Sequence, residues 1–342
     1  MKRKQIIFIA PNEAQLVENE IDEPKANEVL VKTAYSTISA GTERANLIGD
    51  LNIDPTRLPA SDTPEYPRTT GYCSSGVVCK VGKNVTRFKE GDRVIGMWSK
   101  HASYNVFPEH AVVKIEHDDI SLSEAAVAFI ATFSLGGLRK TAPEIGESAI
   151  VFGLGILGIY AVQFAKAAGL VPIIAVDPIQ ERREMAIKMG ADYAFSPFEE
   201  GFVEKVKALT NGGANVAIEV TGKGQGLNQT LDCMARFGRV ALLGCTRSSD
   251  FTVDYYRKVH FPGIALVGAH TNARPNLQSR PYNHTEGDDL RAILNLLHGK
   301  RINLEKMISE THSPTEANEV FHRLAFDKNF PIGVQFDWGL LE

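Results

Sequence analysis

The sequence predicts an α/β protein in which a β-rich part and a doubly wound parallel sheet share one chain. Three observations support this prediction. From Met1 to about residue 120, short alternating runs are separated by Gly, Pro and Asp clusters. From about residue 123 to residue 268, apolar runs of strand length alternate with segments of helical period. The length of 342 residues suggests two domains at roughly 150 residues each.

The N-terminal part is predicted to form irregular β structure. Its β-branched runs alternate apolar and polar residues and are bounded by turn-forming residues. Strands are expected at Val29–Tyr35, Gly76–Val81, Arg93–Ile95 and Ala111–Ile115.

The middle part is predicted to alternate strands with helices. Its continuously apolar strand candidates are typical of a parallel sheet covered by helices on both faces. The strand candidates are Ala149–Phe152, Pro172–Val176, Val216–Glu219, Val240–Leu243 and Ile264–Val267. The helix candidates are Leu157–Ala168, Glu181–Met189, Phe202–Thr210 and Leu227–Phe237.

The C-terminal part changes character after Ala269. It stays polar through about Gly287, then forms one predicted helix, Leu290–Leu297, and a last strand, Ile332–Phe336. Because a finished doubly wound sheet has no place for this late strand, we expect it to return to the N-terminal part. The predicted domains are therefore residues 1–122 with 300–342, and residues 123–299.

The composition argues against several classes of protein. A net charge of -4 gives no reason to expect nucleic acid or an anionic membrane as a partner. No two of the four cysteines form a C-x-x-C pair, so a reduced, cytoplasmic compartment fits best. The apolar stretch Ser148–Val176 is interrupted by closely spaced glycines and Lys166. It is therefore interpreted as a strand–turn–helix–strand unit rather than a membrane span.

The turn after the first middle strand carries the pattern G-x-G-x-x-G at Gly153, Gly155 and Gly158. In a dinucleotide-binding turn the first glycine permits the tight turn, the second admits the pyrophosphate, and the third lets helix and strand pack closely. The phosphates then lie on the helix N-terminus. Asp177 ends the next strand, 19 residues after Gly158, where an acid accepts hydrogen bonds from the ribose hydroxyls.

The acid at position 177 predicts NAD rather than NADP, because a carboxylate repels the 2′-phosphate of NADP. Arg182 and Arg183 lie in the following helix, either stacked on adenine or on the surface. The residues expected to contact the dinucleotide are Gly153, Gly155, Ile156, Leu157, Gly158, Asp177, Arg182, Val220, Thr221, Gly244, Cys245, Gly268 and Ala269.

Four stretches carry a resemblance to a known family: Gly82–Val94, Gly153–Gly158, Gly190–Asp192 and Ile218–Gly222. Over nearly its whole length the chain resembles the medium-chain dehydrogenase/reductase superfamily, in its alcohol- and polyol-dehydrogenase lineage. The resemblance implies a GroES-like β-rich catalytic domain, a Rossmann dinucleotide-binding domain and a homodimer or homotetramer.

The ligand positions of the zinc-dependent members are altered. Their C-G-[ST]-D stretch resembles Ala40-Gly41-Thr42-Glu43, with alanine in place of cysteine. Their G-H-E stretch resembles Gly71-Tyr72-Cys73. Catalytic zinc needs three protein ligands, and no third candidate occurs near Ala125–Thr132. We therefore expect no metal, as in a zinc-lacking branch whose Ile38–Arg44 stretch is similar.

Without zinc, acid–base side chains and fixed donors must stabilise the developing alkoxide. Thr42 matches the family's relay hydroxyl, although it is equally an ordinary turn threonine. Tyr72 is a candidate donor to the substrate oxygen, the alternative being a packed aromatic. Glu43 is a candidate for the chemistry, unless it forms a buried pair with Arg44. His270 follows the last strand of the sheet and faces the same expected cleft.

A polar segment extends from His270 to Arg291 and includes Arg274, Arg280, Tyr282, His284, Glu286, Asp288 and Asp289. It suits a hydroxyl-rich or anionic substrate, but a solvated loop or an oligomer contact explains it equally well. His101 and Tyr104 are weaker candidates.

The sequence thus predicts a zinc-independent, NAD-linked oxidoreductase acting on a polyol, sugar or related secondary alcohol. One rival is an NAD(P)H-dependent enone or quinone reductase. The other is a non-enzymatic nucleotide-sensing protein.

Overall fold

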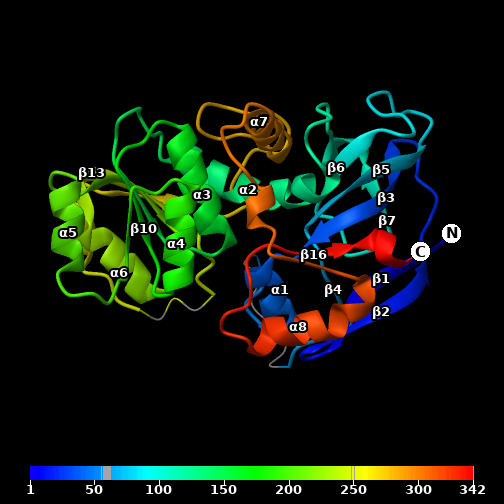
Figure 1. The fold of residues 1–342 in the computed structure, drawn as a ribbon, viewed down its shortest axis with the longest axis horizontal. Coiled ribbons are helices and arrows are strands. Elements are labelled where there is room, and N and C mark those ends of the chain that lie inside the picture. The colour runs from blue at the N-terminus through cyan, green and yellow to red at the C-terminus, as the bar shows by residue number, and fades with distance from the viewer. Residues whose placement is uncertain (55, 57–62, 248, 250, 342) are drawn as a thin grey trace. The chain divides into compact units, whose positions relative to one another are not determined.

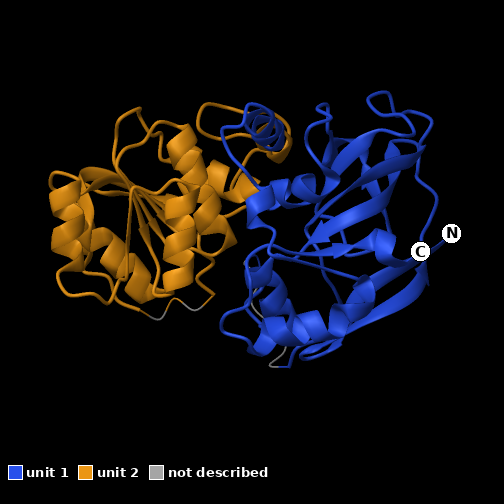
Figure 2. Cartoon of the chain, in the orientation of Figure 1, with its two compact units in different colours: residues 1–130, 290–342 blue, residues 131–289 orange. Residues whose placement is uncertain are grey.

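The computed structural model describes residues 1–54, 56, 63–247, 249 and 251–341, and the chain divides into two compact units (Figure 2). Unit 1 comprises residues 1–130 and 290–342, and unit 2 comprises residues 131–289. The divisions fall within two helices, α2 (Leu122–Lys140) and α7 (Glu286–His298). The sequence predicted divisions at 122/123, at the start of α2, and at 299/300, after the end of α7.

Unit 1 is rich in strands. Its first segment contains β1 (Lys2–Ala10), β2 (Glu13–Glu20), β3 (Glu28–Thr37), α1 (Ala40–Leu47), β4 (Arg68–Thr69), β5 (Cys73–Val81), β6 (Arg93–Met97), β7 (Tyr104–Pro108) and β8 (Val112–Lys114). Its second contains β15 (Glu310–His312), α8 (Ala317–Phe326) and β16 (Val334–Asp337). The four strands predicted here correspond to β3, β5, β6 and β8.

The strands of unit 1 form two sheets. One has the order β2-β1-β4, and the other has the order β15-β16-β3-β5-β6-β8, with β7 also paired to β3. The last strand, β16, pairs antiparallel with β3, so that Gln335 is opposite Thr37. The expected return of the late strand to the N-terminal part is confirmed.

A hydrophobic core lies between β1, α8 and the C-terminal strand. Phe8, Phe321 and Phe336 are fully buried there. The rings of Phe8 and Phe321 meet edge to face at 4.9 Å between centroids, a geometry favoured by their quadrupoles. Helix α8 supplies Val320, Phe321 and Leu324 from one face, as expected of an amphipathic helix.

Unit 2 is a six-stranded parallel sheet with the order β11-β10-β9-β12-β13-β14, which confirms the doubly wound prediction. The strands are β9 (Ala149–Phe152), β10 (Ile173–Val176), β11 (Tyr193–Phe195), β12 (Ala214–Glu219), β13 (Met234–Leu242) and β14 (Ala265–Gly268). The helices are α3 (Ile156–Ala167), α4 (Gln180–Met189), α5 (Phe202–Leu209) and α6 (Gly224–Asp232). Figure 1 shows α3 and α4 on one side of this sheet and α5 and α6 on the other.

Two predictions for unit 2 are wrong. The helix expected at Leu227–Phe237 ends at Asp232, and β13 begins at Met234. The apolar spacing of Cys233 and Met234 continues the helical period, although these two side chains are buried among strand residues. The last strand was expected to be buried on both faces, but Ala265 and Leu266 of β14 are exposed. As the final strand of the sheet, β14 lacks the cover that the central strands receive.

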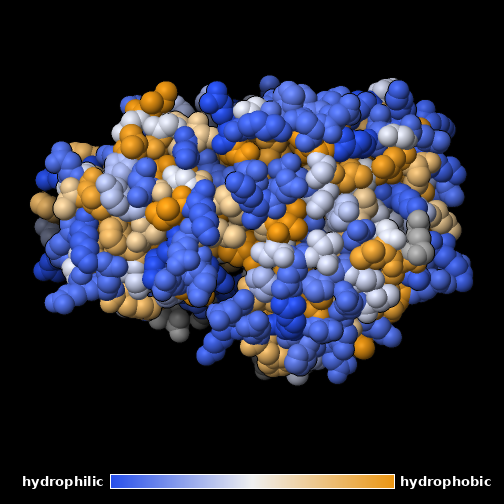
Figure 3. Space-filling view, viewed as in Figure 1, coloured by the Kyte–Doolittle hydropathy of each residue, from blue (hydrophilic) through white to orange (hydrophobic). Residues whose placement is uncertain are grey.

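One helix among the described residues is long and apolar enough to cross a membrane, α2, which the sequence analysis did not predict. Of its most apolar window, 72% is buried inside the protein, as in a core helix. The surface in Figure 3 is mostly hydrophilic, with hydrophobic residues interspersed among charged ones.

Candidate active site

The glycine-rich turn of unit 2 has the geometry that its sequence predicts. Gly153 has a φ of 95°, which favours glycine. A Cβ at Gly158 would lie 1.9 Å from the carbonyl oxygen of Gly153. A Cβ at Gly155 would meet nothing within 4 Å. The backbone of the turn therefore disfavours a side chain at its first and third glycines, whereas it has free space beside its second.

Gly155 is also the N-cap of α3. No side chain caps this end of the helix, and its first turn contains no acidic residue. Ile156 and Leu157 lie in that first turn, and their position leaves backbone N–H groups and the positive helix end for an anion. The open second glycine adds the space that a pyrophosphate requires.

The other residues expected to contact the dinucleotide lie at the carboxyl ends of adjacent strands. The last residues of four neighbouring strands pair with one another in the parallel register. They are, in order across the sheet, Phe152 of β9, Glu219 of β12, Leu242 of β13 and Gly268 of β14. Val220, Thr221, Gly244, Cys245 and Ala269 follow directly after these strand ends. A Cβ at Gly153 would lie 3.0 Å from Thr221 Cγ2, and one at Gly244 would lie 2.7 Å from the carbonyl carbon of Val220. The structure therefore brings the predicted turns together at one edge of the sheet.

Asp177 follows β10 and is directed toward the glycine-rich turn. Its Oδ2 accepts a hydrogen bond from the N–H of Leu154 at 2.8 Å, and its Oδ1 accepts one from the N–H of Ile179 at 2.8 Å. The side chain is only 4% exposed. Each oxygen retains a second lone-pair direction. The carboxylate thus fixes the turn and stays at the position expected to meet the ribose.

The two arginines after Asp177 behave differently. Arg182 places Nη1 3.9 Å from Asp177 Oδ2, whereas Arg183 donates to the carbonyl oxygens of Asp177 and Pro178. Arg182 therefore partly offsets the negative charge of the carboxylate, and Arg183 caps the local backbone.

Glu219 was not predicted as a site residue. Its Oε1 accepts from the N–H and the hydroxyl of Thr221, and its Oε2 accepts from the N–H of Gly222 at 3.3 Å. Burial raises the pKa of this carboxyl, and the hydrogen bonds from Thr221 oppose that rise. The signal in the sequence was an acid at the end of an apolar strand, the same signal that identified Asp177. Glu219 shapes the turn that carries Val220 and Thr221.

His270 follows β14 and is half-buried. Its Nδ1 accepts a hydrogen bond from the N–H of Asn272 at 3.2 Å, so the neutral ring carries its proton on Nε2. Burial lowers the pKa of His270, and the nearby charge of Lys140 lowers it further. Lys140 is itself held by the carbonyl oxygens of Gly268 and Ala273. Burial and Lys140 therefore both favour the neutral imidazole, with its proton on Nε2.

The polar segment after His270 is organised around a buried ion cluster. Asp289 is fully buried, with its Oδ1 2.5 Å from Arg139 Nη1 and its Oδ2 3.2 Å from Arg274 Nη1. Arg274 also donates to the carbonyl oxygen of Thr132, and Arg139 contacts His284 Nδ1. Arg139, Arg274, His284 and Asp289 thus contact one another within unit 2. Arg274 and Asp289 therefore hold the segment in place rather than extend into solvent, whereas Tyr282 is exposed.

In unit 1, Thr42 lies on α1 and is partly exposed, but the next residue, Glu43, is fully buried. Glu43 Oε1 accepts from the N–H of Ser39 at 2.7 Å, and Oε2 accepts from the hydroxyl of Thr70 at 2.5 Å. The alternative pairing with Arg44 does not occur, because Arg44 donates to the carbonyl oxygen of Ala325 instead.

A buried polar chain continues from Glu43. The Nε2 of His101 lies 2.9 Å from Glu43 Oε2, and its Nδ1 lies 2.7 Å from Ser36 Oγ. Ser36 Oγ in turn accepts from Trp338 Nε1 at 2.9 Å. With its Nε2 proton, His101 donates to Glu43, and Ser36 can then donate to Nδ1. Both His101 and Glu43 are inaccessible to a substrate, and their contacts hold other residues in position.

Tyr72 follows Gly71, whose φ is 118° and whose Cβ would lie 2.5 Å from the backbone nitrogen of His101. The ring of Tyr72 packs on Trp98 at 5.1 Å between centroids and is partly exposed. Glu43 thus connects the start of the helix that carries Thr42 with Thr70, two residues before Tyr72. Both partly exposed candidates of unit 1 depend on the same buried carboxylate. Tyr104, a weaker candidate, lies on β7.

Two family models match the chain. The alcohol dehydrogenase GroES-like domain matches residues 25–129, and the zinc-binding dehydrogenase domain matches residues 157–280. The L-threonine 3-dehydrogenase of Thermococcus kodakarensis is 30% identical over 283 residues, covering 75% of this chain and 78% of the relative. The D-guloside 3-dehydrogenase of Escherichia coli is 28% identical over 289 residues, covering 80% and 82%.

Solved structures show the same fold. A zinc-binding dehydrogenase from Sinorhizobium meliloti bound to NADP has a TM-score of 0.80 at 20% identity, covering 98% of this chain and 99% of the other. An alcohol dehydrogenase from Escherichia coli CFT073 complexed with NADH has a TM-score of 0.81 at 19% identity, with the same coverage.

A strand-rich GroES-like unit joined to a parallel sheet with a glycine-rich turn defines a two-domain oxidoreductase. The chain belongs to the medium-chain dehydrogenase/reductase superfamily, among its alcohol dehydrogenase-like members, and is a dehydrogenase acting on alcohols.

Proposed function

We propose that this protein is a zinc-independent, NAD-linked dehydrogenase that interconverts a secondary alcohol and a ketone on a polyol, sugar or related polar substrate. The observation that carries the proposal is the edge of the unit 2 sheet. There an open glycine at a helix N-terminus and a nearby acid, Asp177, provide for pyrophosphate and ribose. The substrate class is supported by relatives named for hydroxylated substrates, a threonine and a guloside.

The preference for NAD over NADP follows from Asp177. An acid after the second strand of a dinucleotide-binding unit is expected beside the ribose, where its charge would repel a 2′-phosphate. Arg182 reduces this repulsion only partly, because its guanidinium is 3.9 Å from a carboxylate oxygen. The structural relatives include one bound to NADP and one bound to NADH, so the choice rests on the residues of this chain.

Zinc independence follows from the donor set at the matching positions. Ala40 offers no ligand atom. Cys73 offers one sulfur atom, and its side chain is fully buried. Glu43 is fully buried and already accepts hydrogen bonds from backbone, hydroxyl and imidazole partners. Catalytic zinc requires three protein ligands, and these residues do not provide them.

The proton transfer is then assigned to uncharged side chains. We assign the relay hydroxyl to Thr42, and donation to the substrate oxygen to the hydroxyl of Tyr72 and to Nε2–H of His270. Glu43 is assigned a positioning role. Loss of one positioned acid or base generally lowers the rate by roughly 10²–10⁴-fold.

The cofactor and substrate assignments are tested together by two measurements. Fluorescence titration with NADH and NADPH is expected to show tighter binding of NADH. A panel of polyols, sugars and enones is expected to show turnover with the hydroxylated compounds. Reduction of enones with NADPH, and no oxidation of any alcohol, would instead support the reductase alternative.

The metal assignment is tested by turnover after dialysis against a chelator. Activity is expected to remain unchanged, because no step uses zinc. Inactivation by the chelator that added zinc reverses would overturn the assignment.

The acid–base assignment is tested with Tyr72→Phe, Thr42→Val and His270→Ala. The first two remove a hydroxyl and keep the shape of the side chain. Each variant is expected to lose turnover while its affinity for NADH stays near that of the wild type. Near-normal turnover in all three would move the site to other residues, first to the segment from Arg274 to Asp289.

We also propose that the protein is a homo-oligomer, either a homodimer or a homotetramer, as family membership suggests. In support, β14 is the final strand of its sheet and exposes Ala265 and Leu266, and a strand edge is a template for pairing with a second copy. Light scattering is expected to give a multiple of the chain mass, and Leu266→Glu to reduce it. A monomer at all concentrations would contradict the proposal.

A further inference from the structure

A group of metal-binding side chain types lies in unit 1, apart from the residues assigned above. His117 and Asp119 occupy the loop between β8 and α2, and His298 is the last residue of α7. One ligand atom from each side chain lies within 4.8 Å of the other two. Among the described residues this is the only group of three or more His, Cys, Asp or Glu side chains with that spacing. We call it the histidine–aspartate cluster.

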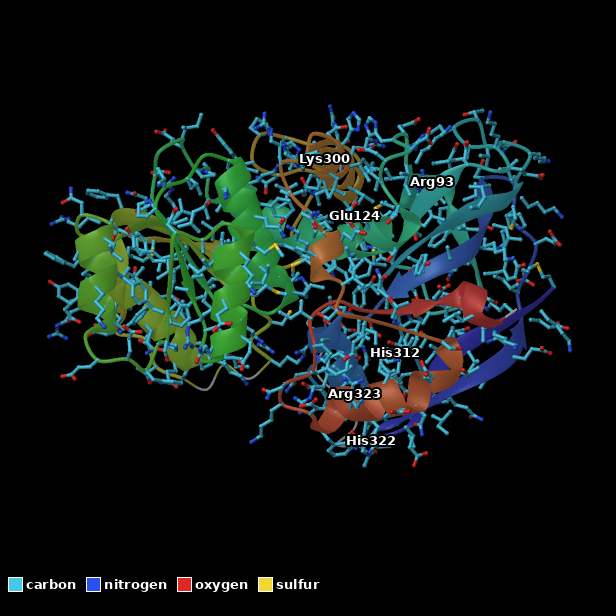
Figure 4. All side chains as sticks on the ribbon, viewed as in Figure 1. Arg93, Glu124, Lys300, His312, His322 and Arg323 are labelled. Atoms are coloured by element: carbon cyan, nitrogen blue, oxygen red, sulfur yellow. The ribbon has the colours of Figure 1, made fainter. Side chains whose placement is uncertain are left out.

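The contacts within the cluster are specific. The two imidazole rings are stacked, with 3.8 Å between centroids and an interplanar angle of 4°. Asp119 Oδ1 is 3.0 Å from His298 Nδ1, and Asp119 Oδ2 is 2.7 Å from Lys300 Nζ. Figure 4 labels Lys300, which follows the C-terminal end of α7.

The loop that carries two of the three side chains is anchored from a strand. Arg93 of β6, also labelled in Figure 4, donates to the carbonyl oxygens of His117 and Ile120. The guanidinium therefore fixes the backbone on both sides of Asp119, and the cluster does not depend on a freely moving loop.

We propose that His117, Asp119 and His298 form a surface site for a divalent late transition metal, with Zn²⁺ as the occupant. Two imidazole nitrogens and one carboxylate oxygen are a donor set that suits zinc. Since the cluster is exposed on one side, water completes a tetrahedral shell. A histidine binds a metal through a ring nitrogen that carries no proton.

Two adjustments accompany binding. In a tetrahedral site with Zn–N bonds of about 2.05 Å, the ligand atoms are roughly 3.3 Å apart, so the three side chains must draw together and the rings must leave their stack. The Lys300 ammonium must also leave Asp119, because it competes with the metal for the same carboxylate. The side chains of His298 and Lys300 are 54% and 71% exposed, so both movements are unobstructed.

Substitution of Lys300 should change the affinity for the metal in the opposite direction to substitution of a ligand. Removal of a ligand should weaken metal binding, whereas removal of the competing ammonium should strengthen it. If Zn²⁺ bound only nonspecifically to the protein surface, removing a histidine of the cluster and removing a histidine elsewhere would change the affinity equally. His322 on α8, which is exposed and contacts the ring of Phe326 at 4.6 Å between centroids, provides the matched control.

The experiment is calorimetric titration of chelator-treated, full-length protein with ZnCl₂. The wild type is expected to bind one Zn²⁺ per chain and to show no heat of binding with MgCl₂. His298→Ala and Asp119→Asn are expected to weaken binding at least tenfold, Lys300→Met to strengthen it, and His322→Ala to leave it unchanged. Circular dichroism in the presence of chelator checks that every variant is folded.

Several results would overturn the proposal. These are the absence of saturable binding to the wild type, equal affinity in His298→Ala, and equal losses in His298→Ala and His322→Ala. Turnover of the zinc-loaded and metal-free proteins is expected to be the same, since the cluster shares no residue with the proposed catalytic set. If zinc is required for turnover and still binds to His298→Ala, the metal lies elsewhere, and both this proposal and zinc independence fail.

Discussion

The dinucleotide edge of unit 2 and the Thr42–Tyr72 region of unit 1 are built in different ways. At the first, the proposed functional atoms belong largely to the backbone, and small residues keep that backbone accessible. At the second, the proposed functional atoms are side-chain hydroxyls, and a buried carboxylate and imidazole hold the backbone near them. A site made of backbone atoms is expected to lose its ligand when an added side chain blocks it. A site made of side chains is expected to lose activity when a residue that supports those side chains is removed. Substitutions can therefore test the two regions separately.

Gly158→Ala is expected to have the largest effect. Its Cβ would lie 1.9 Å from the carbonyl oxygen of Gly153, so the turn would have to open, at a cost of about 3 kcal/mol in the free energy of unfolding. NADH binding is expected to be lost. Chemical denaturation and fluorescence titration measure the two effects.

Gly155→Ala is the matched control for this substitution. Its Cβ would meet nothing within 4 Å, so the stability should be unchanged while NADH binding weakens. If Gly155→Ala binds NADH normally, the pyrophosphate does not approach this glycine and the backbone description of the site is wrong.

Glu43→Gln is expected to rank second. The substitution keeps the shape and removes the charge from a fully buried group that accepts three hydrogen bonds, which should lower the free energy of unfolding by about 2 kcal/mol. Turnover should fall, because the substitution loosens the supports of both Thr42 and Tyr72. NADH affinity, a property of unit 2, should be retained. A fall in stability without any fall in turnover would restrict Glu43 to a structural role.

Asp177→Ser is expected to have a smaller effect, in cofactor choice. The loss of the carboxylate removes repulsion toward a 2′-phosphate and leaves Arg182 free to contact it, so the preference should shift toward NADP on the order of tenfold. The ratio of kcat/KM values with the two cofactors measures the shift. A wild type that already prefers NADP would refute the premise.

The smallest expected effect is the pH dependence that His270 gives to wild-type turnover. Because burial and Lys140 lower its pKa below 6.5, the neutral ring persists to a pH below that value, and turnover should fall only as the pH drops through the lowered pKa. The unfolded state binds this proton more readily, so the contribution of His270 to stability is complete above pH 6.5 and declines below it. A pH–rate profile of wild type and His270→Gln tests this, and an acidic limb above pH 7 lost in the variant would contradict it.

The difference between the regions also explains how far sequence reasoning extended. The glycine spacing, the acid at position 177 and the apolar strands are local patterns, and they placed the unit 2 sheet and its edge correctly. The error at Leu227–Phe237 came from an apolar spacing that fits a helix and a strand equally. Glu219 lies within the Ile218–Gly222 motif, but the motif alone does not indicate that its carboxylate accepts hydrogen bonds from the following turn.

The unit 1 network could not be predicted in this way. Ser36, Glu43, His101 and Trp338 are separated by up to 302 residues, and no local pattern indicates that they meet. In the sequence, polar residues such as Glu43 and His101 suggest side chains that contact solvent or substrate. In the structure both are fully buried and contact other side chains instead. The histidine–aspartate cluster has the same origin, since it joins positions 117 and 298 through the fold.

The pairing of β16 with β3 has a consequence for synthesis of the chain. Gln335 donates to the hydroxyl of Thr37, 298 residues away, and β16 carries Phe336 of the unit 1 core. Unit 2 is complete by residue 289, so its sheet has all its strands while the ribosome still holds the last segment. Because domains generally fold as units as they emerge, the middle of the chain forms the unit that matures first. The N-terminal strands, although made earliest, wait for the last residues before their sheet is whole.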